Sequence, residues 1–79
     1  MELDRFIELF AEQFEDTPPE AFNADTAYHD LDEYSSILAL SIMAMVGEEY
    51  DVALRGEDLR NAVTIRDLFN IVQCSNRID

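Results

Sequence analysis

The residue types that perform catalysis are few in this chain of 79 residues. It contains one histidine, His29, one cysteine, Cys74, and no lysine. A lysine nucleophile, a Schiff base, an internal disulfide and a cysteine-based zinc site are therefore excluded within one chain. Ser36, His29 and Asp30 could be written as a catalytic triad, but no nucleophile elbow or evident oxyanion hole accompanies them. We expect no enzyme, and we interpret Cys74 as a small, reduced, partly buried apolar residue without a role.

Acidic residues cluster at Asp30, Asp32 and Glu33, which raises the question of a metal site. The beginning of this segment is similar to a calcium-binding loop. Such a loop needs a glycine at its sixth position and a glutamate at its twelfth, where this chain has Ser35 and Ser41. The match fails, so we expect solvated carboxylates and no metal site, with loose divalent-cation binding by these three acidic residues as the alternative.

We expect helices to position these residues. The chain has only two glycines and two prolines, so it has few residues that favour turns, and this favours helices over many short strands. Apolar residues at helical spacing predict a first helix over residues 3–14, with its apolar stripe facing the core. Pro18 and Pro19 stop this helix. The irregular stretch that follows predicts a long loop, which Phe22 and Tyr28 anchor to the core.

The second predicted helix begins beside Ser35, whose hydroxyl is a good N-cap worth about 1 kcal/mol relative to alanine. Residues 37–46 contain a single polar side chain, Ser41. A helix that is apolar nearly all round either lies at the centre of a bundle or meets another molecule on one side. Both alternatives remain open for a small bundle. Gly47 within this segment should cost about 1 kcal/mol relative to alanine, or else end the helix early or allow close packing.

The remaining segments predict one short helix and one longer closing helix. Residues 56–61 form one or two helical turns, and Thr64 then caps a last helix. Asp67 lies at the position from which a carboxylate reaches back to that cap. The sequence therefore predicts an all-α protein with four helices, a long loop between the first two and a short third helix, in a single domain over residues 1–79.

The charge of the chain restricts its partners. With 18 acidic and 5 basic residues, its formal net charge is -13, so nucleic acid repels it and an anionic membrane does not recruit it. The N-terminal residues lack the pattern of a secretory signal, and no apolar stretch is long enough to span a bilayer. We expect a cytoplasmic monomer.

Taken together, the segments resemble the acyl carrier protein family over about residues 3–72. The family's attachment motif, Asp-Ser-Leu, is similar to Ser35-Ser36-Ile37 in this chain. The acidic-acidic-aromatic end of its second helix is similar to residues 48–50, and its Thr-Val start of the fourth helix is similar to residues 64–65. The resemblance implies a four-helix bundle of the acyl carrier type.

The resemblance also implies a prosthetic group and partners. Ser36 would carry a 4'-phosphopantetheine arm, with Ser35 as the helix cap beside it. A phosphopantetheinyl transferase would add the arm, and acyl ligases, synthases or transferases would load and use it. A phosphate beside the free N–H groups of a helix N-terminus is a favourable arrangement, which supports this site. The carried group and the pathway do not follow from the sequence.

Two departures from the family pattern affect this interpretation. Ser35 replaces the family's aspartate, and Tyr34 replaces a residue that is usually small. If Leu31 fixes the register, Ser35 instead of Ser36 takes the attachment position; we prefer Ser36 because Ile37 then fills the apolar position after it.

The expected docking surface is less acidic than is usual for the family, which suggests dedicated partners. We expect it to comprise the acidic segment, the first helical turn, one helix face and the acidic helix end: Asp30, Asp32, Glu33, Tyr34, Ile37, Leu38, Ser41, Met45, Glu48 and Glu49. A rival hypothesis is a non-enzymatic interaction module that keeps the bundle but lacks the arm and docks a partner through its apolar second helix. A small hydrolase that uses Ser36 is a third and weaker hypothesis.

Overall fold

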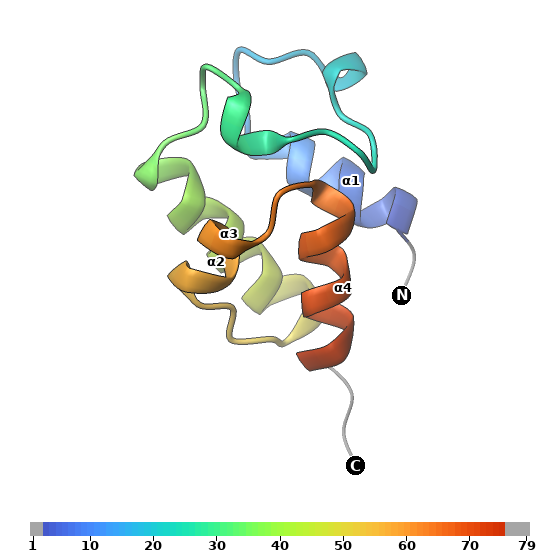
Figure 1. Cartoon of the computed structure of the whole chain (residues 1–79), viewed down its shortest axis with the longest axis vertical. Coiled ribbons are helices and arrows are strands. Elements are labelled where there is room, and N and C mark those ends of the chain that lie inside the picture. Colours follow the sequence, from blue (N-terminus) through green and yellow to red (C-terminus); the bar gives the residue numbers. More distant parts are fainter. Residues whose placement is uncertain (1–2, 76–79) are drawn as a thin grey trace.

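The computed structural model describes residues 3–75, which form α-helices joined by loops and two 3₁₀ turns (Figure 1). The helices are α1 (Leu3–Glu12), α2 (Ser36–Tyr50), α3 (Gly56–Asn61) and α4 (Ile65–Ser75). The turns η1 (Pro19–Ala21) and η2 (Tyr28–Asp30) lie in the long connection between α1 and α2. The prediction of an all-α bundle with a long first loop and a short third helix is confirmed.

The apolar stripe of α1 faces the core, as its spacing predicts. Phe6 and Phe10 are fully buried. The ring of Phe6 lies 5.4 Å from that of Phe69 in α4 and 5.7 Å from that of Tyr50 in α2. Burying each such phenylalanine contributes about 1.5–3 kcal/mol. These aromatic contacts hold α1, α2 and α4 together.

The first helix is shorter than its periodicity predicts. It ends at Glu12. The backbone amides of Gln13 and Phe14 donate to the carbonyls three residues earlier, Phe10 O (3.2 Å) and Ala11 O (3.0 Å), as in a turn that is tighter than an α-helix. Phe14 is still buried. The prediction of a helix to residue 14 is therefore wrong by two residues, because the last apolar side chain of the stripe lies in the turn that follows the helix.

The amides just after this turn are bound by a side chain from the far end of the loop. The carboxylate of Glu33 accepts hydrogen bonds from the backbone N–H groups of Glu15 (2.8 Å), Asp16 (3.0 Å) and Thr17 (2.9 Å), and from the Thr17 hydroxyl (2.8 Å). Desolvation raises the pKa of Glu33, but the hydrogen bonds outweigh it and the pKa is lowered from its ordinary value. This contact fixes the segment that leads into α2.

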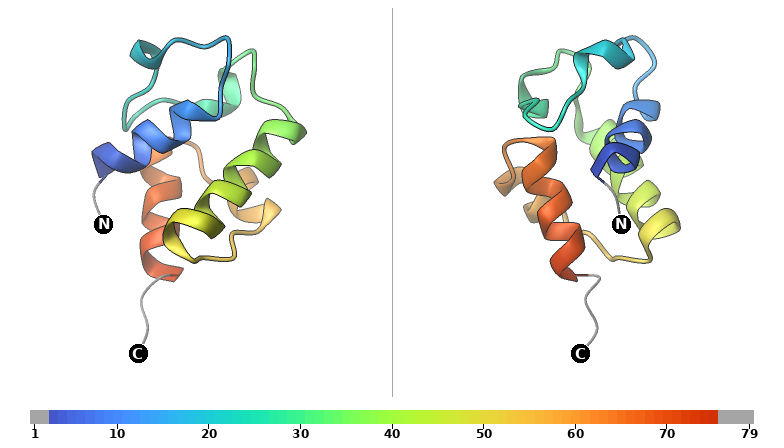
Figure 2. Two further views of the ribbon diagram at one scale, coloured as in Figure 1. Left: turned by 180° about the vertical axis from the view of Figure 1, so that it is seen from behind. Right: turned by 90° about the vertical axis from the view of Figure 1, so that its right-hand side faces the viewer.

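Backbone hydrogen bonds also join the loop to the start of α4. The amides of residues 65 and 66 donate to the carbonyls of residues 26 (3.2 Å) and 24 (2.9 Å), and Ala27 and Thr64 form an isolated antiparallel β-bridge. Phe22 and Tyr28 are both buried, so their predicted role as loop anchors is confirmed. In both views of Figure 2 the loop arches over the end of the bundle at which α2 begins.

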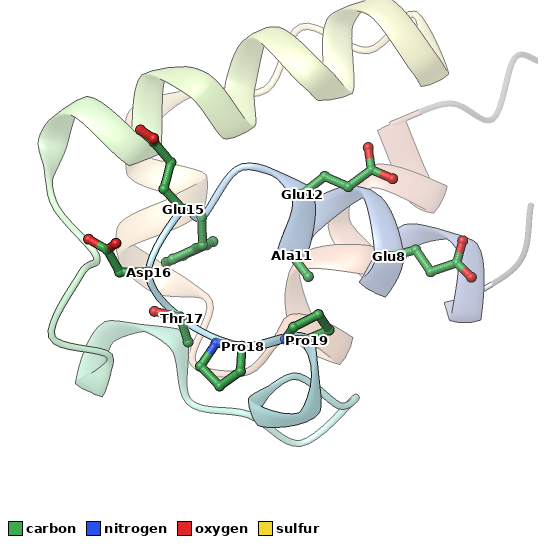
Figure 3. Close-up of a pocket in the computed structure, with 9 residues that line it drawn as sticks. Glu8, Ala11, Glu12, Glu15, Asp16, Thr17, Pro18 and Pro19 are labelled. Carbon is green, nitrogen blue, oxygen red and sulfur yellow. The ribbon is translucent and has the colours of Figure 1, made fainter.

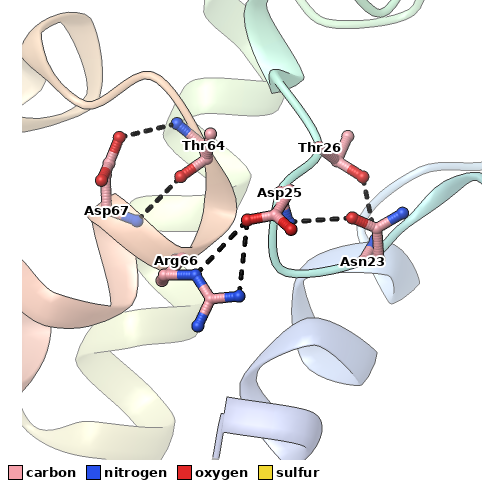
Figure 4. A network of polar contacts seen from close by, with 6 residues as sticks. All are labelled: Asn23, Asp25, Thr26, Thr64, Arg66 and Asp67. Carbon is pink, nitrogen blue, oxygen red and sulfur yellow. Dashed lines mark hydrogen bonds and ion pairs between the residues drawn. The ribbon is translucent and has the colours of Figure 1, made fainter.

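Thr64 and Asp67 cap α4 in the way the sequence predicts. The amide of Asp67 donates to the Thr64 hydroxyl at 3.1 Å, and the Asp67 carboxylate accepts from the amide of Thr64 at 3.1 Å (Figure 4). Hydrogen bonds from the backbone amides of Thr64 and Val63 lower the pKa of Asp67. Figure 4 also shows the ion pair of Arg66 with Asp25 (3.4 Å), which is exposed and contributes no more than about 1 kcal/mol.

The second helix runs without a break through Gly47 to Tyr50. Ile42 and Val46 are fully buried, and the helix ends at Asp51, which adopts the left-handed conformation (φ 56°). Gly47 therefore neither ends the helix nor makes a close approach, since the nearest atom to a Cβ placed there would be Val52 O at 4.0 Å.

Candidate functional site

Ser36 is the first residue of α2, and its side chain is exposed. The preceding residue, Ser35, has extended backbone angles, and its hydroxyl accepts a hydrogen bond from the amide of Leu38 at 3.4 Å. This confirms the predicted N-cap at Ser35. Both serines are exposed, but the Ser35 hydroxyl caps the helix, whereas the Ser36 hydroxyl makes no hydrogen bond to residues 3–75.

A groove of about 380 Å³ lies beside Ser36, between the first turns of α2 and the short α3. Its walls combine small and apolar side chains with two polar rings and one guanidinium group. The lining residues are His29, Tyr34, Ser35, Ser36, Ala39, Leu40, Gly56, Leu59 and Arg60. Free N–H groups of the first helical turn favour an anion at this end of α2.

Two side chains from η2 connect the loop to the end of α3. The Tyr28 hydroxyl donates to Leu59 O at 2.6 Å and lies 3.3 Å from Ala62 O. Nε2 of His29 lies 2.9 Å and 3.0 Å from the same two oxygens. Carbonyl oxygens only accept, so Nε2 carries a hydrogen. Burial raises the pKa of Tyr28, which therefore stays protonated and able to donate.

Tyr34 completes this cluster of rings. Its ring lies 5.2 Å from that of Tyr28 and 5.2 Å from that of His29, edge-on to both. Burial raises its pKa, so the Tyr34 hydroxyl is uncharged at neutral pH. The aromatic residue that departs from the family pattern therefore forms one wall of the groove.

The histidine is not arranged for a catalytic triad. Its Nε2 is bound to the backbone of α3, and within residues 3–75 no hydrogen bond joins it to Ser36 or Asp30. The structure therefore offers no support for the hydrolase hypothesis.

The acidic segment before α2 divides into two parts. Asp30 and Asp32 are exposed, whereas the Glu33 carboxylate accepts hydrogen bonds from the amides of residues 15–17, which follow the turn after α1. Over residues 3–75, no group of three or more acidic, histidine or cysteine side chains is arranged to hold a metal ion.

The residues of the predicted docking face on α2 differ in how exposed they are. Ile37 is 75% exposed, Leu38 and Ser41 are half-buried, and Glu48 and Glu49 are exposed at the far end. Met45 differs from the expectation, because it is only 5% exposed and packs in the core.

Leu40, which the sequence did not single out, is 62% exposed and lies next to the groove. A helix that is apolar on all sides does not reveal which side faces the core, so periodicity alone could not separate Leu40 from Met45.

Cys74 is exposed near the end of α4, so the expectation that it is partly buried is wrong. The buried side of this helix is made by Ile65, Leu68, Phe69 and Val72, and Cys74 lies outside that stripe. No helix in the described part of the chain is long and apolar enough to cross a membrane.

A second hollow, of about 420 Å³, lies at the end of α1 and the following turn. Figure 3 shows that its acidic side chains, Glu8, Glu12, Glu15 and Asp16, point in different directions and do not converge on one point. Ser36 does not line this hollow. The groove between α2 and α3 is therefore the candidate site.

A family model for the phosphopantetheine attachment site matches residues 4–72. No curated protein and no solved structure gives a significant match to the chain. The matched segment runs from α1 into α4 and contains both serines, the groove and the ring cluster.

Proposed function

The chain belongs to the phosphopantetheine attachment-site family, whose prosthetic group is 4'-phosphopantetheine, and we propose that it is an acyl carrier protein modified at Ser36. It is not itself an enzyme in this proposal. When bound, the group supplies a terminal thiol that holds an acyl or related cargo as a thioester. The observation that carries the proposal is the family match together with one exposed serine at the first turn of α2.

The residues around Ser36 fit such a group. The hydroxyl is exposed and makes no hydrogen bond to residues 3–75, so a modifying enzyme can reach it. The neighbouring Ser35 hydroxyl is engaged with the Leu38 amide, which supports Ser36 over Ser35 as the attachment residue. The first-turn amides of α2 stabilise negative charge, so the helix favours a phosphodiester there.

The chain's own residues would bind and orient, while partner enzymes perform the reactions. The exposed Ile37 and Leu40 form an apolar surface next to Ser36, with Asp30 and Asp32 before it and Glu48 and Glu49 at the end of α2. We propose that a phosphopantetheinyl transferase and an acyl ligase, synthase or transferase dock here. Apolar contact near the serine and acidic contact at both ends would orient them. We propose that the carrier acts in the cytoplasm as a monomer.

Acyl loading tests the carrier function. The protein is first modified by a phosphopantetheinyl transferase and then incubated with an acyl ligase and a labelled acyl substrate. The exposed Cys74 is a second thiol, so the experiment uses the Cys74→Ser variant to remove that background. We expect hydroxylamine-sensitive label on the modified protein and none on Cys74→Ser,Ser36→Ala. Label that requires neither the arm nor Ser36 would contradict the proposal.

The alternative is an interaction module with the same bundle and no arm, which the exposed apolar residues Ile37 and Leu40 favour. It predicts that several transferases fail to modify the folded chain while the unmodified chain binds its partner stably. Substituting Leu40→Glu would abolish that binding, because it places a charge in the apolar surface.

A further inference from the structure

Among the arginines within residues 3–75, Arg60 alone has no acidic partner there. Arg5, Arg55 and Arg66 pair with Glu8 (3.0 Å), Glu57 (3.6 Å) and Asp25 (3.4 Å). Arg60 forms no ion pair with any residue in the range 3–75, although the chain has 18 acidic residues. Arg60 lines the groove that contains Ser36.

The local geometry of α3 explains how Arg60 reaches this groove. Gly56 lies four residues earlier, one helical turn away, and also lines the groove. A Cβ placed on Gly56 would lie 3.5 Å from Nη1 of Arg60, so the guanidinium lies back along the helix over the glycine. The positive charge is therefore held beside the first turn of α3, on the side that faces the groove.

A second nitrogen-bearing side chain lines the same groove. His29 is held by its Nε2 contacts to Leu59 O (2.9 Å) and Ala62 O (3.0 Å), and its ring lies 4.4 Å from that of Tyr28. In the tautomer with its hydrogen on Nε2, Nδ1 carries only a lone pair, so this ring does not donate to a phosphate oxygen. The ring is thus fixed in orientation as a wall of the groove, and Arg60 is the cationic side chain that lines it.

We propose that Arg60 binds the phosphodiester of the prosthetic group on Ser36. This inference rests on the proposed function. A phosphodiester on Ser36 brings a permanent negative charge to a groove that holds the arginine without an ion pair. The N–H groups of a guanidinium match phosphate oxygens in geometry as well as charge. Such a contact directs the first part of the arm along the groove between α2 and α3.

The test compares the unmodified and the modified protein by NMR, with intact mass recorded on each sample. Attachment of the arm should shift the Nε–H resonance of Arg60 and leave that of Arg66 unchanged, since Arg66 is paired elsewhere and does not line the groove. In the modified protein, Arg60→Gln should shift and narrow the ³¹P resonance of the phosphodiester. The matched control Arg66→Gln should leave that resonance as in the wild type.

The outcomes separate the two proposals. A protein modified at Ser36 whose Arg60 resonance does not move on modification, or whose ³¹P resonance is the same in the wild type and Arg60→Gln, overturns this inference alone. A folded protein that no transferase modifies overturns the proposed function and this inference with it. The apo-to-holo comparison of the wild type needs no variant, so it remains decisive even if Arg60→Gln fails to fold.

Discussion

The contact between η2 and the end of α3 makes a quantitative prediction for Tyr28→Phe. The substitution removes one hydroxyl from a fully buried ring, and with it a 2.6 Å hydrogen bond to Leu59 O. Leaving a buried carbonyl unpaired costs about 1–3 kcal/mol. Here Nε2 of His29 remains 2.9 Å from the same oxygen. We therefore expect the free energy of unfolding to fall by only about 1 kcal/mol.

The companion substitution His29→Phe tests whether the two donors substitute for one another. It keeps a ring beside Tyr28 but removes Nε2, and the Tyr28 hydroxyl still donates to Leu59 O. We expect this variant to lose about 1 kcal/mol or less. In the double variant the carbonyls of Leu59 and Ala62 lose both side-chain donors. Its loss should therefore exceed the sum of the single losses by about 1 kcal/mol or more.

Urea unfolding followed by far-ultraviolet circular dichroism is the suitable assay, since the chain has no tryptophan. Each 1 kcal/mol should lower Tm by about 4–8 °C in a domain of this size. Tyr34→Phe is the matched control, because the Tyr34 hydroxyl makes no hydrogen bond to residues 3–75 and its loss should cost less than about 0.5 kcal/mol. Additive losses in the double variant would refute the shared-acceptor reasoning, as would a loss above about 3 kcal/mol for Tyr28→Phe alone.

Three further substitutions test the fold. Tyr50→Phe removes a buried hydroxyl that has no partner among residues 3–75, so the free energy of unfolding should stay the same or rise by up to about 1 kcal/mol; a clear loss in a urea titration would contradict this. Gly47→Ala should raise it by about 0.5–1 kcal/mol, because the site is helical and has room, and a lower Tm would show that the added methyl group clashes. Glu33 has a lowered pKa in the folded state, so the stability that its carboxylate provides is present above its ordinary pKa of 4.5 and is lost as the pH falls through the lower folded value. Thermal melts of wild type and Glu33→Gln should therefore differ most at neutral pH and converge in acid, whereas a difference that stays constant with pH would exclude this role.

Local sequence patterns were sufficient to predict the helices, apart from the end of α1, and the N-terminal caps of α2 and α4. The cap formed by Thr64 and Asp67 joins residues three apart, and the hydroxyl of Ser35 binds an amide three residues later. The core stripe of α1 follows from helical spacing alone. Each of these features depends on neighbours along the chain, which a single sequence records directly.

Contacts between distant residues were not predictable in the same way. Glu33 binds amides 16 to 18 residues earlier, and His29 binds carbonyls 30 and 33 residues later. Nothing in the local sequence distinguishes Glu33 from the exposed Asp32, or Arg60 from the arginines that have acidic partners. Their surroundings depend on how the loop and α3 are placed against one another, and only the fold supplies that placement.

The most direct test of the account is the site of modification itself. Wild type, Ser36→Ala and Ser35→Ala are each incubated with a phosphopantetheinyl transferase and its cofactor donor, and intact mass is measured. The account predicts one added phosphopantetheine group on the wild type and on Ser35→Ala, and none on Ser36→Ala. Modification that persists in Ser36→Ala and disappears in Ser35→Ala would contradict it.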